Sequence, residues 1–289
     1  MAKIAEMMSH KTLDCSNHVA AITEEGCIVF WGSNSHKQCD IPANIENPIA
    51  VSCGGLFTAA LTSEGRVICW GRHHICRDIP LHLANVVQVV CGYDHIAALT
   101  SDGTVICAGS NDSKQCDIPA DLPCVVTISC GYCFTAALTS EGRVVCWGNN
   151  YKNKCQVPAD LPHIVAISCG FTHVAALTLD GQVVCWGDDF HNQCTVPADL
   201  PTIIAVSCGN SFMAALTAEG RVICWGNNTV NQCDVPADLE NVVAISCGNS
   251  FTAALTADGR VVCWGNAAHV QNIKIPDGLH VRTGMVVLM

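Results

Sequence analysis

The stretch Val-Val-Ala-Ile-Ser-Cys-Gly (242–248), Asn-Ser-Phe-Thr-Ala-Ala-Leu-Thr (249–256), Ala-Asp-Gly-Arg-Val-Val-Cys-Trp-Gly (257–265) decides the fold, because copies of it recur along almost the whole chain. Its Cys-Gly pair begins at residues 53, 91, 130, 169, 208 and 247, in one step of 38 and four of 39. The tripeptide Leu13-Asp14-Cys15 is a degraded first copy. Seven copies at a fixed period indicate an array of identical supersecondary units.

Each copy holds four short apolar runs separated by turn residues. In one representative copy they stand at 166–169, 173–178, 183–186 and, more weakly, 193–197. Short runs rich in Val, Ile and Thr and bounded by Gly, Asn, Asp or Pro predict β-strands. Between the second and third runs stands Asp-Gly or Glu-Gly, which predicts a tight hairpin because glycine accepts the positive φ of the turn. Each repeat is therefore expected to be a sheet of four antiparallel strands.

Seven such sheets around an axis form a β-propeller, which leaves only short protected edges. We therefore predict an all-β fold: a single seven-bladed β-propeller of four-stranded antiparallel blades over residues 1–289. The expected repeats span about 11–48, 49–86, 87–125, 126–164, 165–203, 204–242 and 243–278, with a closing segment at 279–289. Contacts between the chain ends should close the ring, because the apolar run 285–289 and the segment Ile4 to Met8 have no blade of their own.

Small residues in the first run of each repeat suit the crowded innermost strand. The recurring Ala-Ala-Leu triads are poor β-formers, and they make sense where neighbouring blades press closely and a larger side chain would overpack. A Trp-Gly pair ends the third run in every repeat but one, where Ala108-Gly109 replaces it. We expect these tryptophans to be structural and to fill the wider outer space between blades.

The 22 cysteines fall mostly into three recurring classes: at the end of the first run, before Trp-Gly, and three residues before Pro. Cys69 is expected to face Ala59 across its hairpin, which leaves it without a thiol partner there. Free cysteine behaves as a small buried hydrophobe, so reduced thiols are predicted and disulfides are the alternative. Cys130-Gly-Tyr-Cys133 lacks a second pair at zinc-finger spacing, and His73-His74-Ile75-Cys76 allows only an adventitious metal site. No metal or cofactor is predicted.

Charge and hydropathy exclude several classes of partner. The net charge is −11, without a basic cluster, whereas phosphate binding demands clustered Lys and Arg. Direct nucleic-acid binding is therefore not expected. No apolar run approaches the ~18 residues of a transmembrane helix, and the N-terminus lacks the apolar core of a signal peptide. We expect no membrane association and an intracellular location, in the cytoplasm or nucleus.

The repeat pattern Ser-Cys-Gly-x-x-(His/Phe)-Thr-Ala-Ala-Leu-Thr-x-(Asp/Glu)-Gly-Arg-Val-x-x-Trp-Gly resembles that of the regulator of chromosome condensation repeat family, over about residues 11–278. In that family the residue before Thr is often His. Here His95 and His173 keep it and His18 aligns with it, whereas Phe occupies the other four copies. The resemblance implies that these histidines are packing elements.

The founding member of that family is a nucleotide exchange factor for the small GTPase Ran that docks on nucleosomes. The resemblance implies the fold more strongly than this activity, because fold does not carry function. The exchange factor inserts a β-wedge from one blade, and repeats of 38 or 39 residues leave no room for it. The short repeats look more like a compact subgroup that includes a secreted β-lactamase inhibitor protein, which binds another protein with one propeller face.

Aromatic and acidic residues select one face for binding. With alternating strands, the loops between the first and second runs share a face with the loops after Trp-Gly. The candidate partner-binding residues there are Tyr93, Asp94, Tyr132, Tyr151, Phe171, Asp188, Asp189 and Phe190. Exposed aromatics suit a protein hot spot. The alternative is that they only cover the bases of the loops.

Catalysis finds no support in the sequence, because no carboxylate pair, phosphate loop or Ser/His/Asp set is singled out. We therefore predict a non-enzymatic propeller without catalytic residues that binds a partner protein. Two alternatives remain: a guanine nucleotide exchange factor whose partner is a small GTPase, and a structural component of a larger assembly, associated with chromatin or a particle.

Overall fold

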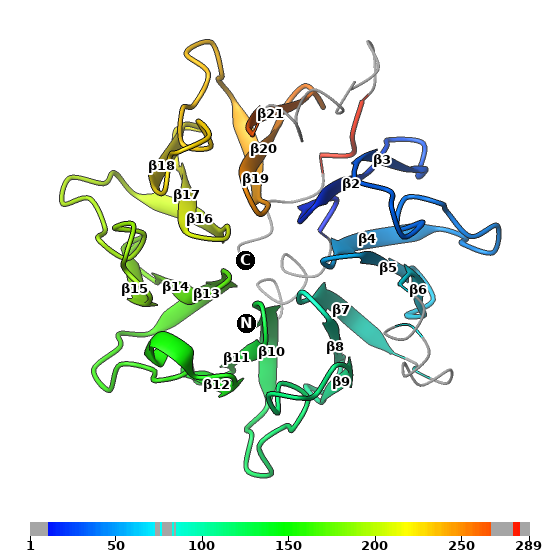
Figure 1. Cartoon of the computed structure of the whole chain (residues 1–289), viewed down its shortest axis with the longest axis horizontal. Coiled ribbons are helices and arrows are strands. Elements are labelled where there is room, and N and C mark those ends of the chain that lie inside the picture. Colours follow the sequence, from blue (N-terminus) through cyan, green and yellow to red (C-terminus); the bar gives the residue numbers. More distant parts are fainter. Residues whose placement is uncertain (1–10, 73–75, 77–82, 84, 267–279, 284–289) are drawn as a thin grey trace.

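The computed structural model describes residues 11–72, 76, 83, 85–266 and 280–283. In this part of the chain, 21 strands form seven antiparallel sheets of three strands each. Figure 1 shows the sheets arranged around a central axis, with the first strand of each sheet innermost. The repeat therefore predicted the all-β propeller correctly, including the degraded first copy.

The sheets follow one another in chain order, and the last three-stranded unit is followed by no further strand in the described residues. The strands are β1 Leu13–Cys15, β2 His18–Ile22 and β3 Ile28–Gly32; β4 Pro48–Cys53, β5 Phe57–Thr62 and β6 Val67–Gly71; β7 Val86–Cys91, β8 His95–Thr100 and β9 Val105–Gly109; β10 Val125–Cys130, β11 Phe134–Thr139 and β12 Val144–Gly148; β13 Ile164–Cys169, β14 His173–Thr178 and β15 Val183–Gly187; β16 Ile203–Cys208, β17 Phe212–Thr217 and β18 Val222–Gly226; β19 Val242–Cys247, β20 Phe251–Thr256 and β21 Val261–Gly265. A short 3-10 helix, η1 (Tyr151–Asn153), follows the fourth sheet.

The prediction of a fourth strand in each blade was wrong. The run 193–197 forms turns instead, after Asn192 with a φ of 58°. The backbone N–H groups of Cys194 and Thr195 donate to the carboxylate of Asp189 over 2.7 and 3.1 Å. A short polar side chain that accepts bonds from nearby backbone donors stabilises a turn in competition with a strand ladder. In the five blades whose following loop is described, a three-stranded sheet is therefore followed by a turn-rich loop.

The hairpin between the second and third strands has the expected turn. In the last sheet, the N–H of Thr256 donates to the carbonyl of Arg260, and the N–H of Gly259 donates to the carbonyl of Thr256, each over 2.9 Å. Gly259 has a φ of +81°, in the left-handed region that costs other residues energy. The Asp-Gly signal therefore fixes the register of the two strands around it.

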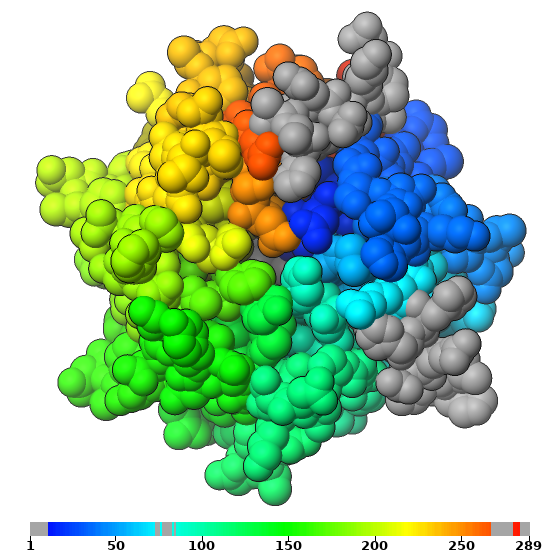
Figure 2. All heavy atoms as spheres, viewed as in Figure 1, coloured from blue at the N-terminus to red at the C-terminus, as the bar shows by residue number. Residues whose placement is uncertain are grey.

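The core consists of apolar layers between neighbouring sheets, and side chains fill the spaces that the ribbons leave open (Figure 2). Ala59 packs with residues of the third sheet, whereas Ala60 packs with residues of the first. Both are fully buried. Because the two faces of one strand each meet a neighbouring sheet, a larger residue would overpack one interface. The expected role of the Ala-Ala-Leu triads is confirmed.

The six tryptophans lie between blades, as predicted, with 6–9% of their surface exposed. Each packs against the preceding sheet; Trp147, for example, contacts a core that contains Val90 and Leu99 of the third sheet. Two indole N–H groups also donate across the interface, from Trp186 to the carbonyl of Lys154 at 3.0 Å and from Trp225 to that of Gln193 at 3.1 Å. These side chains therefore join neighbouring blades.

The first and seventh sheets share a core in the same way, with Trp31 beside Phe251 and Leu255. The described C-terminal segment lies across both sheets. Thr23 pairs with Val281 as an isolated bridge, and the N–H of Val281 donates to the carbonyl of Gly259 over 2.9 Å. The two runs expected to close the ring, 285–289 and Ile4 to Met8, lie outside the described residues.

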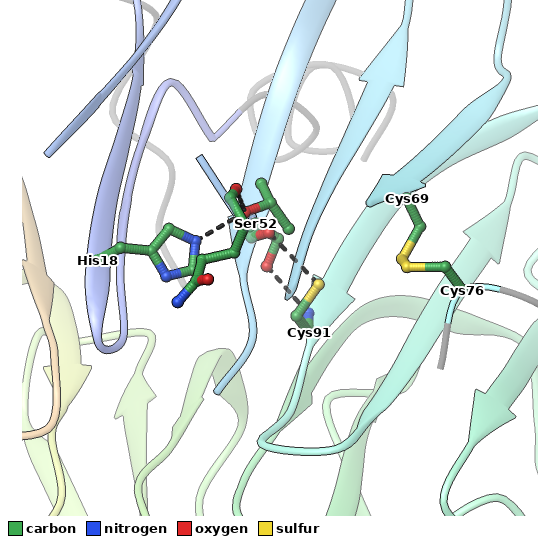
Figure 3. The surroundings of a disulfide bond; sticks show 7 residues. His18, Ser52, Cys69, Cys76 and Cys91 are labelled. Carbon is green, nitrogen blue, oxygen red and sulfur yellow. Dashed lines mark hydrogen bonds between the residues drawn. A yellow bond between two sulfur atoms is a disulfide. The ribbon is translucent and has the colours of Figure 1, made fainter. Parts of the chain in front are cut away.

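The expectation that Cys69 is a free thiol was wrong. Cys69 does face Ala59 across the hairpin, as predicted. Its sulfur is nevertheless bonded to that of Cys76, which enters from the following loop (Figure 3). Ala59 is only the cross-strand neighbour of Cys69, whereas its thiol partner comes from beyond the strand. The remaining 20 cysteines are thiols.

No helix in the described part of the chain is long and apolar enough to cross a membrane.

Candidate functional site

One face of the propeller is built from two kinds of loop that are bonded to each other. The loop after each third strand begins with an N–H that donates to the loop between the first and second strands. Asn149 donates to the carbonyl of Cys133 over 2.9 Å, and Asp188 to that of Thr172 over 3.0 Å. The two sets of loops therefore lie at the same end of each sheet, as the strand alternation predicted. We call this end the loop face.

Three of the predicted aromatic residues meet near the axis on the loop face. The ring centroids of Tyr132 and Phe171 lie 3.9 Å apart and are stacked, and Tyr93 lies 4.8 Å from Tyr132 and 6.1 Å from Phe171. These residues come from the third, fourth and fifth sheets and are half-buried. We call them the aromatic cluster.

Backbone bonds between blades hold the aromatic cluster in place. The N–H of Tyr93 donates to the carbonyl of Gly131 over 3.4 Å, and the N–H of Phe171 to that of Gly209 over 3.3 Å. The Cys-Gly loops of the third and fifth sheets are therefore each bonded to the next one around the axis. An aromatic placed in this loop by the sequence has little freedom to move away from its neighbours.

Asparagine takes the place of the aromatics on the other side of the axis. The Nδ2 group of Asn249 donates to Oδ1 of Asn17 over 2.6 Å, and that of Asn17 donates to the carbonyl of Gly55 over 2.8 Å. Asn210 and Ser16 also line the axial depression. The mouth of the axis is thus apolar on one side and amide-lined on the other. These residues were not among the candidates selected from the sequence.

Tyr151 and Phe190 lie on the outer loops of the loop face and do not stack on the aromatic cluster in the described structure. Their exposed fractions are 63% and 79%. The N–H of Tyr151 donates to Oδ1 of Asn149 over 2.8 Å, which fixes the start of η1. The ring of Phe190 packs edge-on against His191 at 4.9 Å. These two aromatics offer large apolar surface to solvent.

The three predicted aspartates have different surroundings. Asp94 pairs with Arg72 at 3.2 Å, and Asp188 pairs with Lys152 at 3.4 Å. Asp189 instead accepts the loop N–H bonds that replace the fourth strand. Asp94 and Asp188 are therefore compensated charges at the rim, whereas Asp189 shapes the loop that carries Phe190.

Lys154 was missed by the sequence reasoning. Its residue is 2% exposed, and Nζ donates to Oδ1 of Asn149 over 3.0 Å. The ammonium also lies 5.3 Å from the ring centroid of Phe134 and 6.0 Å from that of Tyr151. Burial lowers its pKa. The only available signal was a break in the repeat, since four other copies carry Gln at this position, 38, 115, 193 and 232.

The axis below the loop face is lined by the Ser-Cys pairs of the first strands. The serine of one blade accepts the N–H of the next blade's cysteine: Cys91 donates to Ser52 Oγ over 2.9 Å, and its thiol approaches the Ser52 carbonyl at 3.4 Å (Figure 3). Where Val90 replaces serine, Gln88 makes the bond between blades, accepting the N–H of Ile128 over 2.9 Å. The pairs are thus structural links between blades.

Asp14 takes the serine position in the first blade and makes more bonds than serine does. One carboxylate oxygen accepts the N–H of Cys53 at 2.7 Å and the hydroxyl of Ser52 at 3.0 Å. The other accepts the hydroxyl of Ser246 at 3.2 Å and pairs with Lys11 at 2.5 Å. Asp14 therefore joins the first blade to both of its neighbours.

The three repeat histidines are buried, as the family resemblance implied. Burial lowers the pKa of each to about 4, so their rings are neutral at pH 7. His18 lies 2.7 Å from the hydroxyl of Thr58, which itself donates to the carbonyl of Gln38 over 2.8 Å. Because that hydroxyl proton is used, the ring must donate through Nε2. His18 thereby joins two blades.

The described residues offer no candidate metal site. They contain no group of three His, Cys, Asp or Glu side chains placed to hold an ion. Cys76, from the adventitious site considered above, is part of the disulfide, and His73 and His74 lie outside the described residues. Cys130 lines the axis, while Cys133 lies in the loop that follows it.

A profile of the "Regulator of chromosome condensation (RCC1) repeat" matches six segments of the chain, residues 49–74, 86–115, 125–153, 164–193, 203–232 and 242–269. The chain belongs to this family. The four matched RCC1 segments that lie wholly within the described residues, from 86 to 232, each begin at or near a first strand and end in the loop after a third strand, so the family pattern coincides with the blades.

Curated relatives match only part of this RCC1 chain. The RCC1 domain-containing protein RUG3, mitochondrial, of Arabidopsis thaliana is 37% identical over a region that covers 19% of the chain and 16% of RUG3. The Rho GTPase-activating protein gacGG of Dictyostelium discoideum is 35% identical over 19% of the chain and 6% of gacGG. The chain thus spans less than a fifth of the length of either relative.

Solved structures share the fold over nearly the whole length. Prp20p of Saccharomyces cerevisiae superposes with a TM-score of 0.73 at 18% identity, covering 97% of this chain and 87% of Prp20p. The CRINKLY WD40 ectodomain of the Arabidopsis thaliana receptor kinase ACR4 gives 0.72 at 21% identity, covering 89% and 97%. At this identity the similarity establishes the RCC1 fold.

Proposed function

We propose that this RCC1-repeat propeller binds a partner protein through its loop face and that it does so without catalysis. The aromatic cluster carries the proposal. Tyr and Phe side chains that are already stacked lose little conformational freedom on binding, and aromatic anchors dominate many protein interfaces. The 3.9 Å stacking of Tyr132 and Phe171 supplies such an anchor beside the axis.

The surroundings of the cluster fit the anatomy of an interface. Tyr151 and Phe190 add exposed apolar surface on the outer loops of the same face. The ion pairs Arg72–Asp94 and Lys152–Asp188 give the polar rim that usually surrounds an interface core. The partner's matching surface should therefore be apolar at its centre.

The opposite face is built largely from one repeated element. It carries the hairpin turns, where Arg143 pairs with Glu141 of the same turn at 2.9 Å. Related Glu-Gly-Arg or Asp-Gly-Arg turns recur in other blades. A surface that repeats itself around an axis presents little by which one partner could be chosen. This contrast supports the loop face as the binding face.

A pull-down experiment tests the proposal. Three immobilised chains are incubated with extract of the native source: the unaltered protein, Tyr132→Ala/Phe171→Ala, and Arg143→Ala/Arg221→Ala as a matched control on the opposite face. If a protein is retained by the unaltered chain and by the arginine variant but not by the aromatic variant, the loop face is supported as the binding surface. A protein lost only by the arginine variant would contradict it.

The same experiment separates the alternatives of exchange factor and assembly component. Prp20p, which shares the fold, has been described for its binding to Gsp1p and histones. If a small GTPase is retained, release of a fluorescent guanine nucleotide from it is measured with and without this chain. Accelerated release would replace the non-catalytic proposal with exchange activity. Retention within a stable multi-protein particle would favour the structural role.

We place the protein in a reducing intracellular compartment, the cytoplasm or the nucleus. The support is its thiol content, since 20 of its 22 cysteines are unpaired with another sulfur. Localising a tagged full-length chain in the native source tests this placement.

A further inference from the structure

Four blades carry a pair of thiols at their outer edge. The first cysteine of each pair lies on the third strand, just before Trp-Gly or Ala-Gly, and the second lies nine residues later in the following loop. The pairs are Cys107 and Cys116, Cys146 and Cys155, Cys185 and Cys194, and Cys224 and Cys233. None of these thiols takes part in the proposed binding surface or in the axial links.

The two members of each pair lie close together. Cys107 and Cys116 share a side-chain hydrogen bond, and so do Cys185 and Cys194. The thiol of Cys185 also approaches the carbonyl of Gln193, the residue next to its partner, at 3.7 Å. The pairs 146/155 and 224/233 each pack against a common core cluster.

The loop holds the second thiol of each pair in one position. Its sulfur donates to the first carbonyl of the loop: Cys155 to Asn149 at 3.4 Å and Cys194 to Asp188 at 3.4 Å, with the same contact at Cys116 and Cys233. Four loops of different sequence therefore present a sulfur to the preceding strand in the same way.

The second blade shows what this arrangement can form. Cys69 lies at the same strand position as the first cysteine of each pair, and its partner Cys76 comes from the same loop. Their sulfurs are joined in a disulfide (Figure 3). The loop of this blade is shorter by two residues between the cysteines, yet it reaches the strand.

We propose that the four thiol pairs are oxidation sites, each of which forms a disulfide between the third strand and the following loop when a low-molecular-weight disulfide such as oxidised glutathione is present. One thiolate attacks a sulfur of the reagent, forms a mixed disulfide and releases one glutathione. The second thiol, after losing its proton, attacks the protein sulfur of that mixed disulfide and releases the second glutathione. Two protein thiols are oxidised, and one oxidised glutathione is reduced to two thiols.

The environment of each thiol determines which pairs react earlier. The hydrogen bond that Cys116 accepts from Cys107 lowers the pKa of Cys116. Cys116 is therefore the attacking sulfur of that pair. Burial raises the pKa of Cys155 and of Cys233, to about 11 and about 12. Because the thiolate is the nucleophile, we expect the pair 107/116 to react before the pairs 146/155 and 224/233, which should react faster as the pH rises.

Oxidation would tie down loops of the loop face. Tyr151 lies within the loop that a bond between Cys146 and Cys155 would close, and Phe190 within the loop closed by Cys185 and Cys194. A consequence for partner binding rests on the proposed function, whereas the oxidation sites themselves do not.

The test treats the folded full chain with oxidised glutathione, quenches with acid, alkylates the remaining thiols in denaturant and maps crosslinked peptides by mass spectrometry without reduction. We expect four crosslinks besides that of Cys69 and Cys76. Cys39 is the matched control, because Phe30 occupies the strand position of its partner. It should remain a thiol or carry glutathione, and the exposed Cys27 and Cys124 should show that the reagent is active.

Two variants sharpen the result. Phe30→Cys should add a fifth crosslink to Cys39, and Cys116→Ser should leave Cys107 without a crosslink while the other three form. The proposal is overturned if folded protein whose Cys27 has reacted keeps the paired cysteines as alkylated thiols or separate glutathione adducts. Crosslinks between members of different pairs would overturn it as well.

Discussion

The ring of Tyr132 lies stacked on that of Phe171, with the centroids 3.9 Å apart and the planes inclined by 26°. The two side chains come from neighbouring blades, so the stack forms only when the propeller is assembled. Chain segments 39 residues apart in sequence are thereby joined into one apolar surface. A partner that recognises this surface recognises the folded ring rather than any single repeat.

Asp14 should be a major contributor to stability. In Asp14→Ala, the Cys53 N–H and the hydroxyls of Ser52 and Ser246 lose their acceptor, and Lys11 loses its counter-charge. We expect the free energy of unfolding to fall by about 3 kcal/mol, measured by urea denaturation. Asp14→Ser, which restores the residue of five other repeats, should lose less. Equal losses for the two variants would argue against this role.

His173 should be replaceable by phenylalanine with a gain in stability. Among the described residues, neither ring nitrogen of His173 has a hydrogen-bond partner, since Met213 stands where Thr58 meets His18. Phe212 fills the equivalent site of the next blade. We expect His173→Phe to raise the free energy of unfolding at pH 7 by about 1 kcal/mol. His95→Phe is the control, because it loses a bond to Thr135 and should gain less.

The same variant should reduce the sensitivity of the fold to acid. The pKa of His173 is about 4 in the folded state, against 6.5 as its ordinary value. Between these values the unfolded chain binds a proton that the folded chain does not. The free energy of unfolding is therefore unaffected by this histidine above pH 6.5 and falls as the pH drops towards 4. One such histidine accounts for a loss on the order of 3 kcal/mol. Urea titrations at pH 7 and pH 4.5 should show a smaller difference for His173→Phe than for the unaltered chain; an unchanged difference would contradict the assignment.

The disulfide should stabilise the second blade. Cys69→Ser/Cys76→Ser removes a crosslink that spans a sequence separation of 7 residues. A crosslink across a loop of this length lowers the conformational entropy of the unfolded chain, which stabilises the folded state by about 2 kcal/mol. The melting temperature of the double variant should therefore fall by several degrees. The matched control Cys146→Ser/Cys155→Ser, prepared without added oxidant or reductant, keeps the bond between Cys69 and Cys76 and should melt within a degree or two of the parent. A double variant at 69 and 76 as stable as the parent would show that the bond contributes nothing.

The sequence predicted those features that repeat and missed those that depend on a single local contact. The period, the Asp-Gly turns and the small residues of the triads determine the blades, because each satisfies the same packing seven times. The fourth strand was predicted from composition at 193–197, but Asp189 captures the N–H groups that a strand would need. The partner of Cys69 escaped notice because it comes from a loop outside the hairpin.

The candidate site was predicted in the same uneven way. Strand alternation placed all the chosen aromatics on one face, and the structure brings Tyr93, Tyr132 and Phe171 together. It leaves Tyr151 and Phe190 on separate outer loops, because these follow third strands far from the axis. Ring contacts depend on side-chain direction, which a repeat pattern does not contain.

Partner binding by the loop face is tested most directly by affinity. The dissociation constant of the partner identified by retention is measured for the unaltered chain, for Tyr93→Ala/Phe171→Ala and for Arg143→Ala/Arg221→Ala, after circular dichroism has shown that all three are folded. Loss of a hot-spot aromatic costs on the order of 2 kcal/mol, so the aromatic variant should bind at least ~30-fold more weakly. The arginine variant should bind like the parent. Unchanged affinity in the aromatic variant, together with weakened binding in the arginine variant, would place the functional surface on the opposite face.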